Sequence, residues 1–190
     1  MNEGEGSIKW KQLGRKELLK TRVFTVVERE NEGPGGRKGH FVSLEAPEWA
    51  TIVPLVRKGG QDYFLMVKQY RHGSDELSVE FPGGVVEPGE DPQLAARREL
   101  KEETGCTASS LRLAASVSPN PAIMSNHYHV FLAEGLEKAG GTDFDENEAI
   151  DAFLVPVAEV RASMGRGEYS HALMAAALFF ADRLLAIRTY

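Results

Sequence analysis

The stretch EFPGGVVEPGE, residues 80–90, followed by DPQLAARRELKEETGC, residues 91–106, decides the fold. The second segment predicts a single helix. Asp91 is a favourable N-cap, Pro92 suits the first helical position, and Gly105 is a residue type that commonly ends a helix. The sequence therefore predicts a capped helix entered from a turn with two adjacent glycines.

Three glutamates of this helix are predicted to lie on one arc. At about 100° per residue, Glu102 and Glu103 fall on either side of Glu99. Like charges at these spacings destabilise an isolated helix by roughly 0.2–0.5 kcal/mol per pair. A solvated acidic face is one interpretation. We favour a metal site, because Glu90 adds a carboxylate, Arg98 can hydrogen-bond a glutamate, and Mg²⁺ or Mn²⁺ binds such oxygens and offsets their repulsion.

The composition is that of a globular protein with one good-sized core. The chain has 190 residues, of which 42% are hydrophobic. Cys106 is the only cysteine, so an intramolecular disulfide is excluded, and the start MNEGEGSIKWK lacks the apolar run of a secretory signal. A cytoplasmic location is therefore expected. The net charge of -6 argues against a nucleic-acid partner, because such binding normally needs clustered Lys and Arg.

The apolar run at residues 171–187 is expected to be a core helix and not a membrane span. It is shorter than the roughly 20 apolar residues that a span needs, and it carries Asp182 and Arg183. Apolar residues recur along it at helical spacing, and no membrane partner is expected. The predicted buried stripe consists of Leu173, Ala177, Phe180, Leu184 and Ile187.

Strand patterns dominate the rest of the chain. Two strand-like stretches at residues 21–30 and 38–46, split by the turn-rich residues 31–37, predict an N-terminal hairpin. Strands flanked by helices predict the α/β class with a mixed sheet. We expect an N-terminal strand segment, 1–47, ahead of a main domain, 48–190. Further strands are expected at 50–57, 62–71, 76–81, 111–117, 127–136 and 150–157, and further helices at 157–165 and 171–187.

The helix and its entry turn resemble the 23-residue Nudix box, G-x5-E-x7-R-E-U-x-E-E-x-G-U, in which U is apolar. Gly84, Glu90 and RELKEETGC at residues 98–106 meet every fixed position. Cys106 stands where an aliphatic residue is usual, and cysteine behaves as a small hydrophobe. The resemblance implies a Nudix fold, with a mixed sheet between helices, and hydrolysis of a nucleoside diphosphate linked to another group.

The flanking motifs resemble the ADP-ribose and nucleotide-sugar pyrophosphatase branch of that family. They are EFPGG at 80–84, VKQYR at 67–71, Pro121 and DENEAI at 145–150, and the similarity spans roughly residues 10–185. It implies Mg²⁺- or Mn²⁺-dependent release of a nucleoside monophosphate and a sugar phosphate. It also implies a homodimer that uses the N-terminal strands, with an ordinary self-packed hairpin as the alternative.

The resemblance also implies roles for the residues of the box. Glu99 and Glu103 are expected to bind the metal together with the carbonyl of Gly83. Glu102 is expected to be a further ligand or an acid that acts beside the ligands in catalysis. Arg98 is expected to orient the carboxylates.

Outside these positions, Glu90 is expected either to hold the loop to the helix start or to act in catalysis. In this branch a base often comes from a later loop, here the acidic segment at residues 143–149. Within it we favour Glu146 as the base, with Glu148 as a metal ligand or second base. A merely solvated acidic loop is the alternative.

Arg71 is expected to contact the diphosphate or a ribose, because a guanidinium can donate two hydrogen bonds to a phosphate. A surface residue at the end of a strand is the alternative. Trp49 and Tyr70 are expected to stack on a base or sugar, although core packing explains either ring equally well. The remaining residues expected to bind substrate are Glu80, Asn120 and Pro121.

Several functions remain open within and beyond this prediction. The substrate is ADP-ribose or a nucleotide sugar such as GDP-mannose, UDP-glucose or ADP-glucose. A non-catalytic nucleotide-sugar sensor is disfavoured because the box is intact. An RNA end-processing pyrophosphohydrolase is disfavoured because the acidic charge balance does not suit a polyanion. Neither the number of metal ions nor the identity of the base is fixed by spacing.

Overall fold

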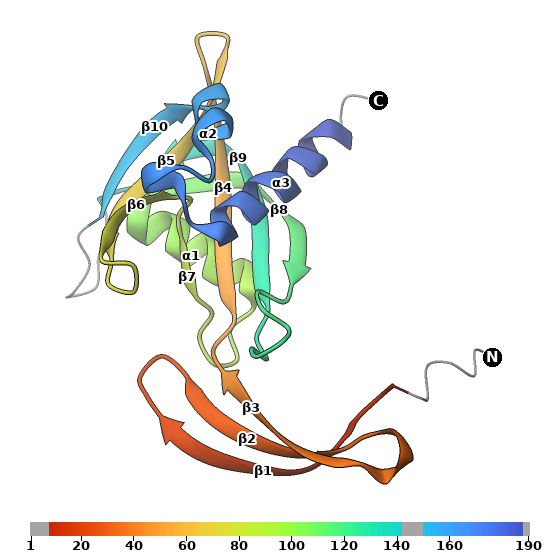
Figure 1. Cartoon of the computed structure of the whole chain (residues 1–190). Coiled ribbons are helices and arrows are strands. Elements are labelled where there is room, and N and C mark those ends of the chain that lie inside the picture. The colour runs from red at the N-terminus through yellow and green to blue at the C-terminus, as the bar shows by residue number, and fades with distance from the viewer. Residues whose placement is uncertain (1–7, 142–149, 188–190) are drawn as a thin grey trace. The chain divides into compact units, whose positions relative to one another are not determined.

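The computed structural model describes residues 8–141 and 150–187 (Figure 1). The contacts of the chain divide it into two compact units. The first consists of residues 1–47 with 118–126, and the second of residues 48–117 with 127–190. No helix of the described residues is long and apolar enough to cross a membrane.

The first unit holds a three-stranded antiparallel sheet, β1 (Lys11–Lys20), β2 (Thr25–Glu32) and β3 (Lys38–Glu45), in the order β1-β2-β3. The predicted hairpin is confirmed as β2 and β3. Strand β1 was not predicted from the sequence. Half of its sequence KQLGRKELLK is charged, and two register shifts against β2 break the alternation that marks a strand.

Residues 118–126 belong to the same unit because they pair with the end of β3. The amide of Leu44 donates to the carbonyl of Ile123 at 2.7 Å, and the amide of Ser125 donates to the carbonyl of Leu44 at 3.2 Å. Hydrogen bonds to β3 therefore join a segment far along the chain to the N-terminal sheet.

The second unit is built on a seven-stranded sheet of order β10-β5-β4-β9-β8, with β6 paired to β5 and β7 paired to β4. The β4–β9 pair is parallel and the other pairs are antiparallel, so the predicted mixed sheet is confirmed. The strands are β4 (Trp49–Lys58), β5 (Gln61–Arg71), β6 (Glu76–Glu80), β7 (Gly83–Val85), β8 (Cys106–Val117), β9 (Tyr128–Lys138) and β10 (Asp151–Pro156).

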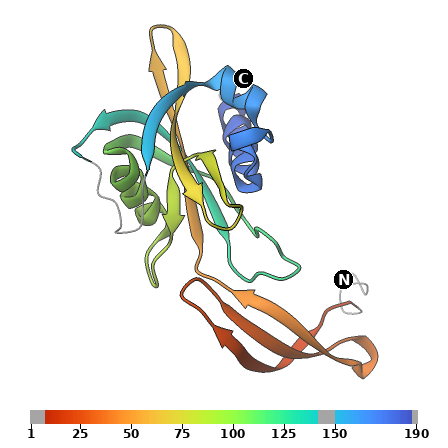
Figure 2. The same ribbon diagram turned by 60° about the vertical axis from the view of Figure 1, so that its left-hand side comes forward.

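Helices cover both faces of this sheet, as Figure 2 shows. Helix α1 (Pro92–Thr104) packs on one face, and α2 (Val157–Ser163) and α3 (Ala172–Ala186) pack on the other. The alternation of side chains along β4 explains the two cores. Ile52 faces the α1 side, whereas Val53 joins the larger core under α2 and α3.

Helix α1 has the ends that its sequence predicted. The Asp91 side chain accepts a hydrogen bond from the amide of Gln93, Pro92 begins the helix, and Gly105 follows it in the left-handed region at φ 66°. Ala95, Ala96 and Leu100 bury its apolar face, Glu103 is buried as well, and the helix lies against β7. The sequence-predicted helix is thus confirmed with its caps.

Helix α3 is confirmed as a core helix, but its buried stripe differs from the predicted one. Ala177 is fully buried, while Ile187 is 72% exposed at the end of the helix, so its assignment to the stripe was wrong. Leu173, Phe180 and Leu184 are only partly buried against the core. The innermost residues are Met174, Ala177, Leu178 and Ala181.

Candidate active site

The two glycines of the PGG turn allow β7 to lie close to its neighbours. Gly83 pairs with Thr51 and Gly84 pairs with Ala50 across the β4–β7 ladder. A Cβ at Gly83 would collide with the carbonyl oxygen of Ala50, and a Cβ at Gly84 would overlap the carboxylate of Glu99. Both positions therefore require glycine, because β4 lies against the first and helix α1 against the second.

Arg98 gathers the carboxylates of the helix. Its Nη1 donates to Glu99 Oε1 at 2.8 Å and to Glu102 Oε2 at 2.9 Å, while Nε and Nη2 donate to the two oxygens of Glu90 at 3.2 and 3.1 Å. Nη2 also donates to the carbonyl of Val85 at 3.0 Å. These contacts, with Glu90 foremost, raise the pKa of the Arg98 guanidinium above its ordinary value. One fixed cation thus orients three carboxylates and ties α1 to β7.

Glu90 joins the entry loop to the helix. Besides its contacts with Arg98, it accepts a hydrogen bond from the amide of Glu87 at 3.0 Å. The Arg98 hydrogen bond is the main cause that holds the pKa of the Glu90 carboxyl below its usual value. The geometry agrees with the expected structural role of Glu90, while a role in catalysis stays a prediction.

Glu103 is turned inward from the same helix. Its side chain is only 4% exposed, and its Oε2 accepts a hydrogen bond from the amide of Gly83 at 2.9 Å. Glu99 lies against Gly84 one turn earlier, so these two carboxylates flank β7, and Glu102 is more exposed. Among the described residues, no three Asp, Glu, His or Cys side chains stand arranged as a complete metal cage.

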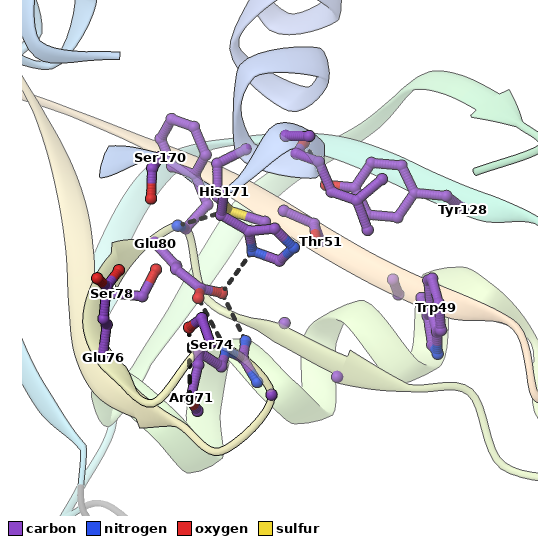
Figure 3. A pocket seen from close by; sticks show the side chains of 18 of the residues that line it. Trp49, Thr51, Arg71, Ser74, Glu76, Ser78, Glu80, Tyr128, Ser170 and His171 are labelled. Carbon is purple, nitrogen blue, oxygen red and sulfur yellow. Dashed lines mark hydrogen bonds and ion pairs between the residues drawn. The ribbon is translucent and has the colours of Figure 1, made fainter. Parts of the chain in front are cut away.

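A cavity of about 600 Å³ lies on β7 and extends to the ends of β5 and β6 and the start of α3 (Figure 3). Of the residues expected to bind substrate or metal, Trp49, Arg71, Glu80 and Gly83 line it. Its volume is within the range of small-molecule sites. The cavity and the glutamate cluster therefore share the strand Gly83–Val85.

Arg71, Glu80 and His171 meet at the polar end of this cavity, as Figure 3 shows. Arg71 donates from Nε and Nη2 to the two oxygens of Glu80, at 2.8 and 2.5 Å, and His171 Nδ1 lies 3.2 Å from Glu80 Oε2. Burial by itself raises the pKa of the Glu80 carboxyl. The hydrogen bonds from Arg71 and the contact with His171 outweigh burial, and this pKa falls to about 2.

The other end of the cavity is lined by aromatic side chains. Trp49 and Tyr128 are paired across the β4–β9 ladder, and both line the cavity. The Tyr128 hydroxyl donates to the carbonyl of Leu173 at 3.0 Å, and burial raises the pKa of this hydroxyl above its usual value. The cavity thus has an aromatic wall and a charged wall.

Three residues expected to bind substrate lie elsewhere. Tyr70 is 45% exposed, stacks edge-on against His72 and donates its hydroxyl proton to Asp75. Successive residues of a strand point to opposite faces, so Tyr70 does not share the face of Arg71. Asn120 and Pro121 are exposed residues of the first unit, outside the lining of the cavity that the described residues form. Their roles in binding stay predictions.

The expected base and its partner, Glu146 and Glu148, lie outside the described residues. Tyr128 and His171 line the cavity as well, and neither was predicted from the sequence to be a site residue. The only local signal for His171 is its place immediately before the apolar helix α3, where backbone N–H groups lack partners within the helix. Its contact with Glu80 is long-range and has no sequence signature.

The sequence is similar to a protein family model and to several characterised hydrolases. A NUDIX domain family model matches residues 46–176. The chain is 30% identical over 153 residues to an ADP-ribose pyrophosphatase of Bacillus subtilis (strain 168), covering 78% of this chain and 80% of the relative. It is 33% identical over 134 residues to the CMP-5'-(N-acetyl-N-hydroxy-3-aminopropyl)phosphonate hydrolase of Streptomyces rubellomurinus, covering 70% and 64%.

The fold is matched over almost the whole chain by a solved structure. A crystal structure of an ADP compounds hydrolase aligns with a TM-score of 0.82 and 26% identity. The alignment covers 95% of this chain and 96% of that one. The sequence and structural comparisons therefore agree on the same group of proteins.

Proposed function

The chain belongs to the Nudix family and is a Nudix hydrolase, and we propose that it cleaves the diphosphate of ADP-ribose or a related nucleoside diphosphate sugar. The observation that carries the proposal is that one strand, Gly83–Val85, contacts both the Arg98-held glutamates and the 600 Å³ cavity. A substrate seated in the cavity therefore lies beside the carboxylates. The relatives named for ADP-ribose and ADP compounds support an adenine nucleotide.

The residues present fit a divalent cation of the magnesium type. Glu99 and Glu103 bring hard carboxylate oxygens to β7, and the missing side chain at Gly84 leaves the space that the Glu99 carboxylate occupies. We propose that these two glutamates hold the cation with the carbonyl of Gly83, and that Glu102 assists them. When bound, such a cation neutralises phosphate charge and lowers the pKa of a water ligand.

The chain's own residues orient the reaction. Arg98 orients the glutamates, because its guanidinium hydrogen-bonds to Glu90, Glu99 and Glu102 together. Arg71 binds a phosphate oxygen or ribose hydroxyl from the cavity wall, and Trp49 offers a flat surface for a base or sugar. Glu146 takes the proton of the attacking water, with Glu148 in support.

The reaction adds one water across the diphosphate. With ADP-ribose the products are AMP and ribose 5-phosphate, and each phosphorus keeps its own ester. A second candidate is another nucleoside diphosphate derivative, such as GDP-mannose. One relative is named as a CMP-phosphonate hydrolase, so a similar chain is named for a nucleotide other than an adenine nucleotide. This relative supports the second candidate.

We further propose that the N-terminal unit, 1–47, serves dimerisation of the Nudix domain, 48–190. Its sheet presents Leu19, Val42 and Phe41 as exposed apolar side chains. Such side chains on a three-stranded sheet suit contact with a second copy. The single cysteine supports a reducing compartment such as the cytoplasm.

The test is a product assay with purified protein, Mg²⁺ and a panel of ADP-ribose, ADP-glucose, GDP-mannose and UDP-glucose. The measurement is the release of a nucleoside monophosphate. One control is the variant E103Q, which removes an expected metal ligand, and the other is treatment of the wild type with a chelator. Cleavage of one or a few compounds, which is lost in E103Q and after chelation, supports the proposal. Binding of a compound without cleavage contradicts it in favour of a sensor.

A further inference from the structure

The charged wall of the cavity is assembled from three separate elements. Arg71 is the last residue of β5, Glu80 is the last residue of β6, and His171 is the residue before α3. Figure 3 shows the carboxylate of Glu80 between the other two side chains. The arrangement joins the start of α3 to the ends of β5 and β6 that line the cavity.

The buried carboxylate of Glu80 is ionised and requires hydrogen-bonding or charged groups around it. It is 1% exposed, and a buried carboxylate is strongly destabilising unless charged or hydrogen-bonding groups surround it. Arg71 supplies the two short bonds, and it remains 43% exposed at the cavity wall. The carboxylate therefore also sets the orientation of the guanidinium that the substrate meets.

His171 is placed to hold the other side of that carboxylate. Its Nδ1 is inaccessible to solvent and has no partner in regular hydrogen-bond geometry within the described residues, yet it lies 3.2 Å from Glu80 Oε2. The oxygen that His171 approaches is the one that accepts the 2.5 Å bond from Arg71 Nη2.

The start of α3 is firmly anchored, so His171 is a fixed support. Met174 Sδ accepts a hydrogen bond from the amide of Phe81 at 3.1 Å, directly after Glu80 in the chain. The carbonyl of Leu173 accepts the hydroxyl of Tyr128. The first turn of α3 is thus tied both to the end of β6 and to β9.

We propose that His171 is a positioning residue, which acts through Glu80 to hold the Arg71 guanidinium in the orientation that binds the substrate's diphosphate or ribose. This inference rests on the proposed function for the identity of the ligand. Its structural half, the control of Arg71 by His171, does not depend on catalysis.

The experiment compares H171L, which removes the polar contact, with H171N, whose side-chain amide can donate from nearly the same position as Nδ1. H171A replaces H171L where leucine prevents folding. H40N is the matched control, because His40 is an exposed histidine beside Glu28, at 3.6 Å, and is not among the residues that line the cavity. R71K removes the Arg71 guanidinium and so identifies its signal in the NMR spectrum.

The first readout is the rotation of the Arg71 guanidinium about its Nε–Cζ bond, measured by ¹⁵N NMR of its side chain without substrate. We expect slow rotation in the wild type, H171N and H40N, and faster rotation in H171L. The second readout is steady-state kinetics. H171L is expected to raise KM about fivefold to tenfold with little change in kcat, because an interaction that binds substrate and transition state equally is weakened.

Unchanged Arg71 rotation in H171L, or in H171A where it replaces H171L, overturns the inference. A fall in kcat with KM unchanged also contradicts it, because that result assigns His171 to the chemical step. A general structural role predicts that H171N fails to restore KM. Where the wild type cleaves nothing in the substrate panel, the proposed function fails, and the NMR comparison still decides whether His171 controls Arg71.

Discussion

The backbone of Gly84 lies against the carboxylate of Glu99 so closely that a Cβ at residue 84 would overlap the carboxylate. Glu99 comes from α1 and Gly84 from β7, so this contact sets how near the helix approaches the strand. The same strand lines the cavity. The absence of a side chain at residue 84 therefore decides how close the Glu99 carboxylate lies to the strand that lines the cavity.

Substitution G84A is expected to displace Glu99 and lower activity by about 100-fold, because misplacing a reacting group by about 1 Å can cost that much. The measurement is kcat/KM on the substrate that the product assay identifies. G140A is the control, since a Cβ there meets no atom of residues 8–141 and 150–187 within 4 Å. Near-normal activity of G84A would show that the contact does not position the site.

Substitution R98K is expected to lower kcat by about 10–100-fold, the usual effect of losing a residue that orients metal ligands. A lysine ammonium cannot reproduce the fork that reaches Glu90, Glu99 and Glu102 together. R97K is the matched control, because Arg97 is exposed on the same helix and bonds only to the carbonyl of Ala108 among the contacts described for it. Equal activity of the two variants contradicts the role of Arg98.

Substitution E103Q is expected to abolish most activity, by about 100-fold or more, while the protein stays folded. The amide oxygen of glutamine can still accept the bond from Gly83, but a charged oxygen is lost. Calorimetric titration with Mg²⁺ should show weaker binding than in the wild type. E137Q, on the exposed part of β9, is the control.

Removal of the metal ion should lower the activity, as the substitution E103Q does. Treatment of the wild type with a chelator is expected to stop product release, and added Mg²⁺ or Mn²⁺ to restore it, because the carboxylates alone supply no electrophile. The rate is measured before and after each addition. Full activity after exhaustive chelation would exclude the proposed metal site.

Glu80 should make stability depend on acid pH. Its pKa falls from 4.5 to about 2 on folding, so its ionised form stabilises the protein above pH 4.5, and that contribution is lost as the pH falls through about 2. The shift is worth about 3 kcal/mol. The free energy of unfolding of the wild type minus that of E80Q should therefore shrink over this range, as followed by urea titration at each pH. A constant difference would show that Glu80 is not held as an anion.

The dimer proposal predicts a mass near twice 20.9 kDa by light scattering after gel filtration. Arginine at Leu19 and Val42, both more than half exposed, should shift the protein toward the monomer without unfolding the second unit. Placing charge on an apolar contact opposes burial. A wild-type monomer at micromolar concentration contradicts the proposal.

Local signals accounted for much of the fold. The caps of α1 and the turns between apolar strand runs act over a few residues, so they are visible in the sequence. Strand β1 escaped because its charged sequence and register shifts hide the alternation. Ile187 was misplaced because a regular spacing says which residues share a face but not where the core ends.

For the candidate site, the residues that share one helix were predictable from the sequence, and the residues that meet through packing were not. Glu99, Glu102 and Glu103 lie on one helix, so helical geometry alone brought them together. Tyr70 and Arg71 are adjacent in the chain, and only the sheet decides which of them faces the cavity. His171 could not be found from the sequence, because its partner Glu80 is distant along the chain and the two meet through packing.

By itself the sequence determined the helix that carries the carboxylates, its caps, and the glycines that let a strand approach it. These depend on backbone geometry and on contacts within a few residues. Only the tertiary structure decided which strands are neighbours, that β7 joins the glutamates to a cavity, and that α3 brings His171 to Glu80. The physical reason is that long-range proximity results from packing both faces of the sheet at once, and no short segment contains that information.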